Sequence, residues 1–266
     1  MNKSPIGIFD SGIGGLTIAN ALKKTLPNES IIYFGDTRHL PYGEKSAKAI
    51  QKFSTDIAKF LLSNKCKAII IACNSASSVA YHSVKNVAKN IPVFNAIEPV
   101  IENIIDKINF SNIGVIGTKA TIQSKIYEKE IMTRCPSAKV FSLATPLLAP
   151  MIEEGFINED ISHTIIKNYL SNKKLKSIDY LILACTHYPL IYQEIKKYYL
   201  GSSVMLINSA DIISKYIAKN LKNKNLLNKL KHAEYHFYVS NYTKSFEKSA
   251  KFFFQEDLKL KEISIT

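Results

Sequence analysis

The sequence lacks any apolar run close to the roughly 18 residues that a membrane-spanning helix needs. It opens with MNKSPIGIFD, without the apolar segment of a secretory leader. These two absences argue against a membrane partner and against export. We therefore expect a cytoplasmic protein.

Cysteine is scarce, with four residues in 266, and no two of them form a CxxC pair. This spacing excludes a dense disulfide framework and argues against a thiolate-rich zinc site, so we expect no metal. Cys66 and Cys135 lie in the polar contexts NKCKA and TRCPS, and we interpret both as incidental. The other two, Cys73 and Cys185, stand in contexts that match each other.

Arginine is almost absent, because only Arg38 and Arg134 occur among 35 basic residues, although the formal net charge is +13. A basic protein ordinarily suggests an anionic partner such as nucleic acid. Arginine, however, is the preferred residue for bidentate phosphate and base contacts. The composition therefore argues against nucleic acid as a partner. We interpret the basic, aromatic stretch 235–254 as a strand and a helix with one apolar face, rather than as a base-stacking surface.

The chain does contain a regular alternation of strand-like and helix-like runs. The predicted strands cover residues 6–9, 31–35, 68–72, 92–94, 113–117, 139–142, 179–184, 204–207, 235–239 and 260–264. The predicted helices cover residues 15–26, 46–63, 76–89, 97–108, 120–133, 159–171, 190–198, 209–222 and 243–255. Such alternation is typical of βαβ units, in which helices cover a mostly parallel sheet. The charged run 222–233 is predicted to be a solvated surface helix or loop.

Two pairs of segments repeat at nearly one interval. KAIIIACNSAS at 67–77 matches DYLILACTHYP at 179–189, and IGIFDSGIGG at 6–15 is echoed by IGVIGTKAT at 113–121. Both pairs lie about 110 residues apart, so we favour two related α/β units over a chance likeness of apolar strands.

The predicted fold is therefore α/β, with two similar three-layer domains built on mostly parallel sheets. No linker separates them cleanly, and the best boundary lies near residue 95. We predict a first domain made of residues 1–95 and about 209–266, because the last strands return to the first half. The second domain is predicted to comprise residues 96–208.

The glycine-rich turn DSGIGGLT at 10–17 follows a predicted strand, as a dinucleotide-binding turn would. Its pattern is incomplete because Thr17 stands where the third glycine belongs, although Asp36 ends the next strand, as a ribose-binding acid would. We favour a different interpretation, in which Asp10 and Ser11 project from the strand end and the glycines allow close packing. Free N–H groups at a helix start can hold a carboxylate as well as a phosphate.

Cys73 and Cys185 each follow a predicted buried strand, at the end of a parallel sheet where active sites form. The next residues, Asn74 and Thr186, are candidate helix N-caps, which would place each sulfur near a helix N-terminus and favour the thiolate. One buried cysteine is commonly an inert apolar residue, but two in matching contexts favour a function. Two thiols on opposite sides of a substrate suit removal of a proton from one face of a carbon and delivery to the other.

His187 lies two residues after Cys185, so both side chains are expected on the same side of the chain. It is either a hydrogen-bonded structural histidine or the partner that keeps Cys185 able to exchange protons. A metal ligand is a third and weaker alternative. Asp10 could serve Cys73 in the same way.

The loop YFGDTRHLPYG at 33–43 is rich in turn residues. We expect it to lie over the strand ends, where Tyr42 could offer its hydroxyl and Gly43 its backbone N–H. An isolated PYG is a weak signal, and its value depends on the motifs around it.

Several motifs, taken together and in order, resemble the glutamate racemase family. They are FDSGIGGLT (9–17), YFGDT with LPYG (33–43), ACNSAS (72–77), IEP (97–99), VIGTKATI (115–122), MIEEG (151–155) and LACTHYPL (183–190). The resemblance covers about three quarters of the chain. It implies two similar α/β domains with the active site in the cleft between them.

The resemblance also implies the roles of individual residues. Cys73 and Cys185 would be the acid–base residues, the first deprotonating D-glutamate and the second L-glutamate, assisted by Asp10, Glu153 and His187. Substrate contacts would come from Asp10, Ser11, Tyr42, Gly43, Asn74, Ser75, Thr186 and His187. The chain departs from the family pattern at Ser75, where threonine is commoner, and at Asn95, where glycine is common.

The implied activity is interconversion of L- and D-glutamate without a cofactor, which supplies D-glutamate for the bacterial cell wall. Glutamate is then the small-molecule partner, and a homodimer stays open. The nearest alternative is an aspartate racemase of the same superfamily. An alternative from another class is a module that binds nucleic acid or protein and keeps the fold without the activity.

Overall fold

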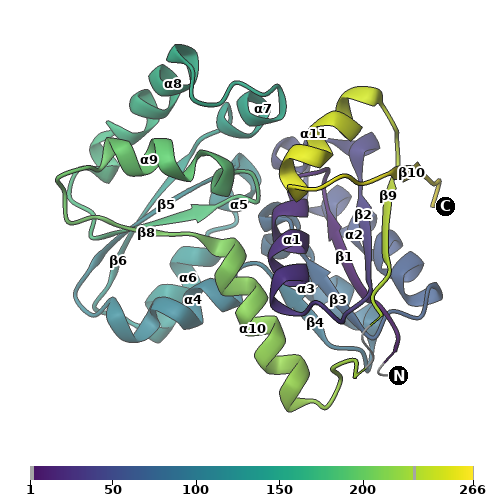
Figure 1. The fold of residues 1–266 in the computed structure, drawn as a ribbon. Helices are drawn as coiled ribbons and strands as arrows, with labels where there is room; N and C mark the ends of the chain where they lie inside the picture. The colour runs from purple at the N-terminus through teal and green to yellow at the C-terminus, as the bar shows by residue number, and fades with distance from the viewer. Residues whose placement is uncertain (1–2, 230–231, 266) are drawn as a thin grey trace.

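The computed structural model describes residues 3–229 and 232–265, and its strands form two separate sheets (Figure 1). The first sheet has the order β10-β9-β2-β1-β3-β4 and the second the order β6-β5-β7-β8, with all neighbouring strands parallel. The strands are β1 (Ile6–Asp10), β2 (Ile31–Gly35), β3 (Ala68–Ile71), β4 (Val93–Asn95), β5 (Asn112–Gly117), β6 (Lys139–Ala144), β7 (Tyr180–Ala184), β8 (Met205–Ile207), β9 (Tyr235–Val239) and β10 (Leu260–Glu262). The predicted α/β class is confirmed.

Helices connect and cover these strands. They are α1 (Leu16–Thr25), α2 (Ala47–Ser63), α3 (Asn74–Ala88), α4 (Glu98–Ile104), α5 (Lys119–Gln123), α6 (Ile126–Arg134), α7 (Leu148–Glu153), α8 (Asp160–Leu170), α9 (Tyr192–Tyr198), α10 (Ser209–Asn223) and α11 (Lys244–Phe254), with short 3₁₀ turns such as η2 (Tyr42–Glu44) and η5 (Tyr188–Ile191). Among the described residues, no helix is both long and apolar enough to span a membrane.

The first sheet is buried on both faces, because successive residues of its strands are apolar. In β1, Ile6 and Ile8 belong to one core and Phe9 to another, and in β2 Tyr33 and Phe34 divide in the same way. The first core includes side chains of α1, α10 and α11, and the second includes those of α2 and α3. Helices on both faces give this half three layers.

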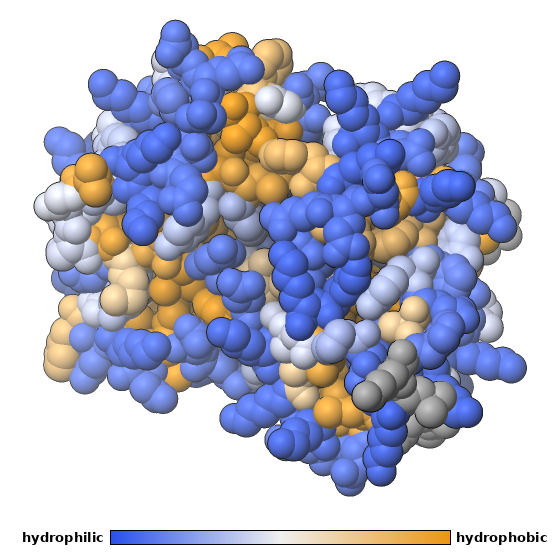
Figure 2. All heavy atoms as spheres, in the orientation of Figure 1, coloured by the Kyte–Doolittle hydropathy of each residue, from blue (hydrophilic) through white to orange (hydrophobic). Residues whose placement is uncertain are grey.

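The second sheet is also flanked by helices, with α8 and α9 on one side and α4 and α6 on the other (Figure 1). The stretch 235–254 forms β9 and α11, and Ala250 and Phe253 are buried, as the sequence predicted. Hydrophilic residues cover most of the face in Figure 2, which agrees with lysines on the solvent sides of the helices. An apolar area in the upper middle of Figure 2 lies over α7. Leu147 and Phe156, which are close to α7 in the sequence, are exposed.

Two helix predictions differ from the structure. The helix predicted at 120–133 is two helices, α5 and α6, because Lys125 adopts a left-handed φ of 54° between them. Helix α7 was not predicted, since six residues that include Pro150 are too few to show helical periodicity. The run 222–233, predicted to be a solvated surface helix or loop, ends α10 and continues as turn and loop, in agreement with the prediction; its residues 230–231 lie outside the described ones.

Strand membership follows the order of the chain with one return. β1 to β4 build the first sheet, β5 to β8 build the second, and β9 and β10 return to the first. This course agrees with the predicted division into residues 1–95 plus about 209–266 and residues 96–208. The domain limits themselves stay a prediction.

Candidate active site

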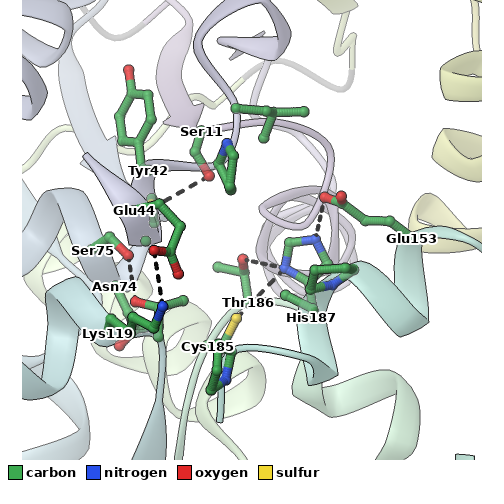
Figure 3. Close-up of a pocket in the computed structure, with 18 of the residues that line it drawn as sticks. Ser11, Tyr42, Glu44, Asn74, Ser75, Lys119, Glu153, Cys185, Thr186 and His187 are labelled. Carbon is green, nitrogen blue, oxygen red and sulfur yellow. Dashed lines mark hydrogen bonds and ion pairs between the residues drawn. The ribbon is translucent and has the colours of Figure 1, made fainter. Parts of the chain in front are cut away.

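A cavity lies where the carboxyl ends of strands from both sheets face each other (Figure 3). It holds about 140 Å³, well below the roughly 300–1,000 Å³ of sites for drug-sized ligands, so its size suits a small metabolite. Of the predicted site residues, those that line it are Ser11, Tyr42, Gly43, Cys73, Asn74, Ser75, Glu153, Cys185, Thr186 and His187. Cys66 and Cys135 are buried outside it.

Cys73 follows β3 and is itself the N-cap of α3, so the expectation that Asn74 caps this helix was wrong by one residue. The backbone N–H of Ala76 donates to Cys73 Sγ at 3.5 Å, and the thiol donates to Ser11 Oγ at 3.6 Å. Burial, followed by the charge of Asp10, raises the pKa of Cys73 to about 12. The predicted preference for thiolate is therefore also wrong here, because desolvation outweighs the helix N-terminus.

Cys185 follows β7 and has a different neighbourhood. Its Sγ lies 3.6 Å from Nδ1 of His187, and Nε2 of His187 lies 2.8 Å from Glu153 Oε1. Only the short turn η5 follows, capped by His187 rather than by Thr186 as predicted. Burial alone would lower the pKa of His187, but the charges of Cys185 and Glu153 prevail and raise it well above its ordinary value.

Asp10 ends β1 and is fully buried just behind the cavity wall. Its carboxylate accepts from the N–H of Gly12 at 3.1 Å and from the hydroxyl of Thr186 at 3.4 Å. Burial is the main reason that its pKa is raised. Since its own carboxylate takes the Gly12 N–H, this donor of the glycine turn serves the protein rather than a ligand.

The glycines of this turn allow close packing on both sides, with the second half at Gly14 and with the first half at Gly15. A Cβ on Gly14 would lie 2.4 Å from Cε1 of His187, and one on Gly15 would lie 2.6 Å from the Cβ of Asp10. The hydroxyl of Thr17 also donates to the carbonyl of Thr186 at 3.0 Å. These contacts favour the packing interpretation of the turn over dinucleotide binding.

Tyr42 lines the cavity with its ring, but its hydroxyl points away from the centre in Figure 3. That hydroxyl donates to Asp36 Oδ2 at 2.6 Å, and Asp36 also accepts from the hydroxyl of Ser240 at 2.7 Å. The expectation that Tyr42 offers its hydroxyl to a ligand was therefore wrong. Asp36 fastens this loop to the end of β9, so it is not poised as a ribose-binding acid.

Asn74 and Ser75 connect α3 to the second half. The hydroxyl of Tyr127 donates to Asn74 Oδ1 at 2.8 Å, while the buried Nδ2 of Asn74 has no hydrogen-bond partner among the described residues. Ser75 Oγ lies 2.8 Å from Thr118 Oγ1 and 3.5 Å from Thr121 Oγ1. A buried amide without a partner is costly unless a ligand or water completes it.

Sequence analysis missed several residues at the site. Thr118, Thr121 and Tyr127 form the contacts just described, and an ion pair of 3.1 Å joins Glu44 of η2 to Lys119 of α5. Both members of this pair line the cavity, on the side opposite His187 and Glu153 in Figure 3. The motif VIGTKATI contains Thr118, Lys119 and Thr121 and could have pointed to them. The other residues reach the site through contacts between segments that are distant in sequence.

The polar groups at the cavity suit acid–base chemistry with neutral donors. Among the described residues, no group of three or more His, Cys, Asp and Glu side chains could hold a metal ion. Lys119 is the one lysine or arginine among the described lining residues. Two thiols, an imidazole with a carboxylate, and hydroxyl and amide donors therefore surround the space.

Comparisons with known proteins agree with this site. The sequence family described as Asp/Glu/Hydantoin racemase matches residues 16–217. A glutamate racemase from Chlorobaculum tepidum is 39% identical over 256 residues, which cover 96% of this chain and 94% of that protein.

Solved structures extend the likeness to the fold. A crystal structure of glutamate racemase from Francisella tularensis in complex with D-glutamate is similar with a TM-score of 0.94 and 42% identity, covering 100% of this chain and 99% of that one. An isoform from Bacillus anthracis gives 0.93 and 35%, again covering 100% and 99%. The protein is an enzyme, a racemase of the isomerase class. Within that class, the chain belongs to the Asp/Glu/Hydantoin racemase family.

Proposed function

We propose that this enzyme interconverts L- and D-glutamate without a cofactor, using Cys73 and Cys185 as its two acid–base residues. The observation that carries the proposal is the position of these two thiols on one small cavity, each at a strand end of a different sheet. Relatives similar over nearly the whole chain are glutamate racemases, and one of them was crystallised with D-glutamate.

The mechanism begins, for L-glutamate, with the thiolate of Cys185 removing the α-proton. The electron pair left on the α-carbon is stabilised as a carbanion by donors to the adjacent carboxylate. The thiol of Cys73 then gives its proton to the opposite face, which yields D-glutamate, a Cys185 thiol and a Cys73 thiolate. The reverse reaction exchanges the two roles, and His187 and Asp10 assist Cys185 and Cys73 respectively.

The protonation of the site supports these starting roles. Cys73 is held as a thiol, since burial and the Asp10 charge raise its pKa to about 12. Cys185 instead lies beside His187, whose raised pKa favours an imidazolium that stabilises a neighbouring thiolate. The proposed mechanism assigns the acid to Cys73 and the base to Cys185 when L-glutamate binds.

Substrate binding is proposed to use neutral donors. The unpartnered Nδ2 of Asn74 is the strongest of them, joined by the hydroxyls of Ser11, Ser75 and Thr186 and the backbone N–H of Gly43. His187 and Tyr42 complete the proposed set, with Tyr42 acting through its ring and backbone. The predicted contact from Asp10 is not retained, because its carboxylate lies behind the cavity wall and accepts from Gly12 and Thr186. Neutral donors stabilise the developing charge without the desolvation cost of an arginine pair.

Incubation of the purified protein with L-glutamate in deuterated water tests the proposal. We expect optical rotation to decay to zero and deuterium to enter the α-position, without added pyridoxal phosphate, metal or nucleotide. L-Aspartate is the control for the aspartate racemase alternative. Faster turnover of aspartate, or activity lost to a chelator and restored by metal, would contradict the proposal.

A role in the cell follows from the same resemblance. D-glutamate made in the cytoplasm would supply peptidoglycan synthesis and so support the bacterial cell wall and cell shape. We also propose that the cavity lies between two domains. One would comprise residues 1–95 plus about 209–266, and the other residues 96–208. Growth of a D-glutamate auxotroph carrying this gene, compared with its Cys73→Ala variant, tests this role.

A further inference from the structure

The imidazole of His187 has a third neighbour besides Cys185 and Glu153. The ring of Phe253 stands edge-to-face against it, with the ring centroids 5.3 Å apart and the planes at 84°. Phe253 is 1% exposed and belongs to α11. The ring of Phe253 is therefore held in the core, whereas the imidazole of His187 lines the cavity.

The same face of α11 also touches the other member of the histidine–carboxylate pair. Ser249 lies one turn before Phe253, and its hydroxyl donates to the backbone carbonyl of Glu153 at 3.4 Å. Residues four apart on a helix share a face. One helix surface therefore contacts both His187 and the residue that holds its Nε2.

These contacts reach across the two sheets. α11 connects β9 and β10 of the first sheet, whereas α7, which carries Glu153, and the loop after β7 belong to the second. Figure 1 shows α11 beside α7. On the N-terminal side Gly14 leaves no room for a Cβ next to His187. The turn before α1 and the helix α11, which both belong to the first half, therefore confine the imidazole ring of His187.

Ring orientation matters because both nitrogens are used. Nδ1 must face Cys185 Sγ, and Nε2 must face Glu153, at 3.6 Å and 2.8 Å. A ring that rotates loses both contacts at once. Edge-to-face packing is a preferred arrangement of two rings, and the buried ring of Phe253 restricts how far the imidazole plane can turn.

We propose that Phe253 is a positioning residue that holds the His187 imidazole in line with Cys185, with Ser249 holding Glu153 beside it. The inference rests on the proposed acid–base role of Cys185. It predicts an effect on one of the two thiols only, because Cys73 has no contact with this helix face in the hydrogen bonds and ring contacts of the described residues.

The experiment compares alkylation rates of Cys185 and Cys73 by iodoacetamide, followed by peptide mass spectrometry across a range of pH. A correctly oriented His187 stabilises the reactive thiolate of Cys185. We expect Phe253→Leu to slow Cys185 alkylation about five-fold near neutral pH and to move its pH midpoint upward. The Cys73 rate in the same molecules should change less than about two-fold, which gives an internal control.

Phe254→Leu is the matched variant, because Phe254 is equally buried on the same helix but packs against Phe237 rather than His187. It should leave both rates within about two-fold of the wild type. Ser249→Ala should lower the Cys185 rate about three-fold, beyond the two-fold limit set for the controls. Phe253→Met, whose flexible side chain can refill part of the space, replaces the leucine variant if that variant fails to fold.

An unchanged Cys185 rate in folded Phe253→Leu or Phe253→Met would overturn the proposal. Parallel changes at both cysteines, or an equal effect of Phe254→Leu, would also overturn it, because they indicate general loosening. Alkylation does not require turnover. If the wild type fails to racemise glutamate while the selective slowing is observed, the proposed function fails and the positioning role stands.

Discussion

Cys73 and Cys185 occupy matching places in the two halves of the chain but have opposite surroundings. Cys73 caps a helix of 15 residues, accepts a backbone N–H and lies near a buried carboxylate. Cys185 is followed only by a 3₁₀ turn and lies beside an imidazole that a second carboxylate holds. The repeat thus gives the two thiols matching positions, whereas their neighbours differ in charge and in hydrogen bonding.

This difference has a chemical use. The proposed two-base mechanism requires one protonated and one deprotonated group on opposite faces of the same carbon. Two identical environments would give both thiols the same protonation state, and one of them would then be wrong. In the proposed mechanism, the unequal neighbours of the two thiols would make one thiol the acid and the other the base.

Removing either thiol breaks the comparison most severely. Cys73→Ala and Cys185→Ala should each lower racemisation in both directions by roughly 10³-fold or more, because each turnover needs an acid and a base. The double variant should lose little more, as for groups that act as a unit. Polarimetry with each enantiomer measures this, and Cys66→Ala is the control expected to stay within a few-fold of normal. Near-normal turnover by either single variant would falsify the two-base mechanism.

Changing the neighbours should expose the asymmetry between the halves. His187→Asn should impair mainly the direction that starts at Cys185, and Asp10→Asn the direction that starts at Cys73, by about 10- to 100-fold in kcat. The equilibrium constant between enantiomers is unity, so kcat/KM falls equally in both directions and the difference appears in kcat and KM separately. Equal changes of kcat in both directions for both variants would show that the neighbours do not divide the work.

The pH dependence of stability sharpens the comparison, because Cys66 shows what burial alone does to a thiol. Burial raises the pKa of Cys66 to about 12, and the unfolded chain ionises near the ordinary value of 9.0. A thiol held neutral in the fold contributes stability below about pH 9 that is lost as the pH rises through about 12. The stability lost in Cys66→Ala should therefore shrink by about 2 kcal/mol between pH 8 and pH 10.5, as measured in urea titrations. A constant difference would mean that the thiol titrates alike in both states.

The smallest expected effect concerns the ion pair between Glu44 and Lys119, which joins the halves at the cavity. The pair is about half exposed, and such pairs contribute only about 0.2–1 kcal/mol. Lys119→Met should raise KM for glutamate about two- to five-fold at low salt, and less at high salt, with kcat nearly unchanged. Lys52→Met, which breaks an exposed pair with Asp56 on α2, is the matched control. An equal change of KM in both variants would assign the effect to net charge.

Much of the fold was predictable because parallel strands buried on both faces leave unmistakable apolar runs, and every predicted strand is present. Helix α7 could not be predicted because six residues that include a proline show no helical periodicity. Without this helix, the sequence offered no physical reason to choose Glu153. The cap of α3 lies one residue earlier than predicted because the sulfur of Cys73, rather than the side chain of Asn74, accepts the backbone N–H of Ala76.

The site was predictable where motifs mark it and not where distant segments meet. Nothing local indicates that the Tyr42 hydroxyl is taken by Asp36, that Tyr127 holds Asn74, or that Phe253 packs on His187. The pKa of Cys73 was misjudged for the same reason, because burial depends on the whole molecule while a helix N-terminus can be read locally.

The return of β9 and β10 to the first sheet has a consequence for the order of assembly during synthesis. The four strands of the second sheet are consecutive in the chain, whereas β9 pairs with β2 across about 200 residues. A nascent chain emerging through β8 therefore carries a complete second sheet while β2, with its sequence IIYFG, is an open apolar edge. We expect this edge to need protection until the last strands emerge, and the confinement of His187 by α11 to be among the last contacts formed.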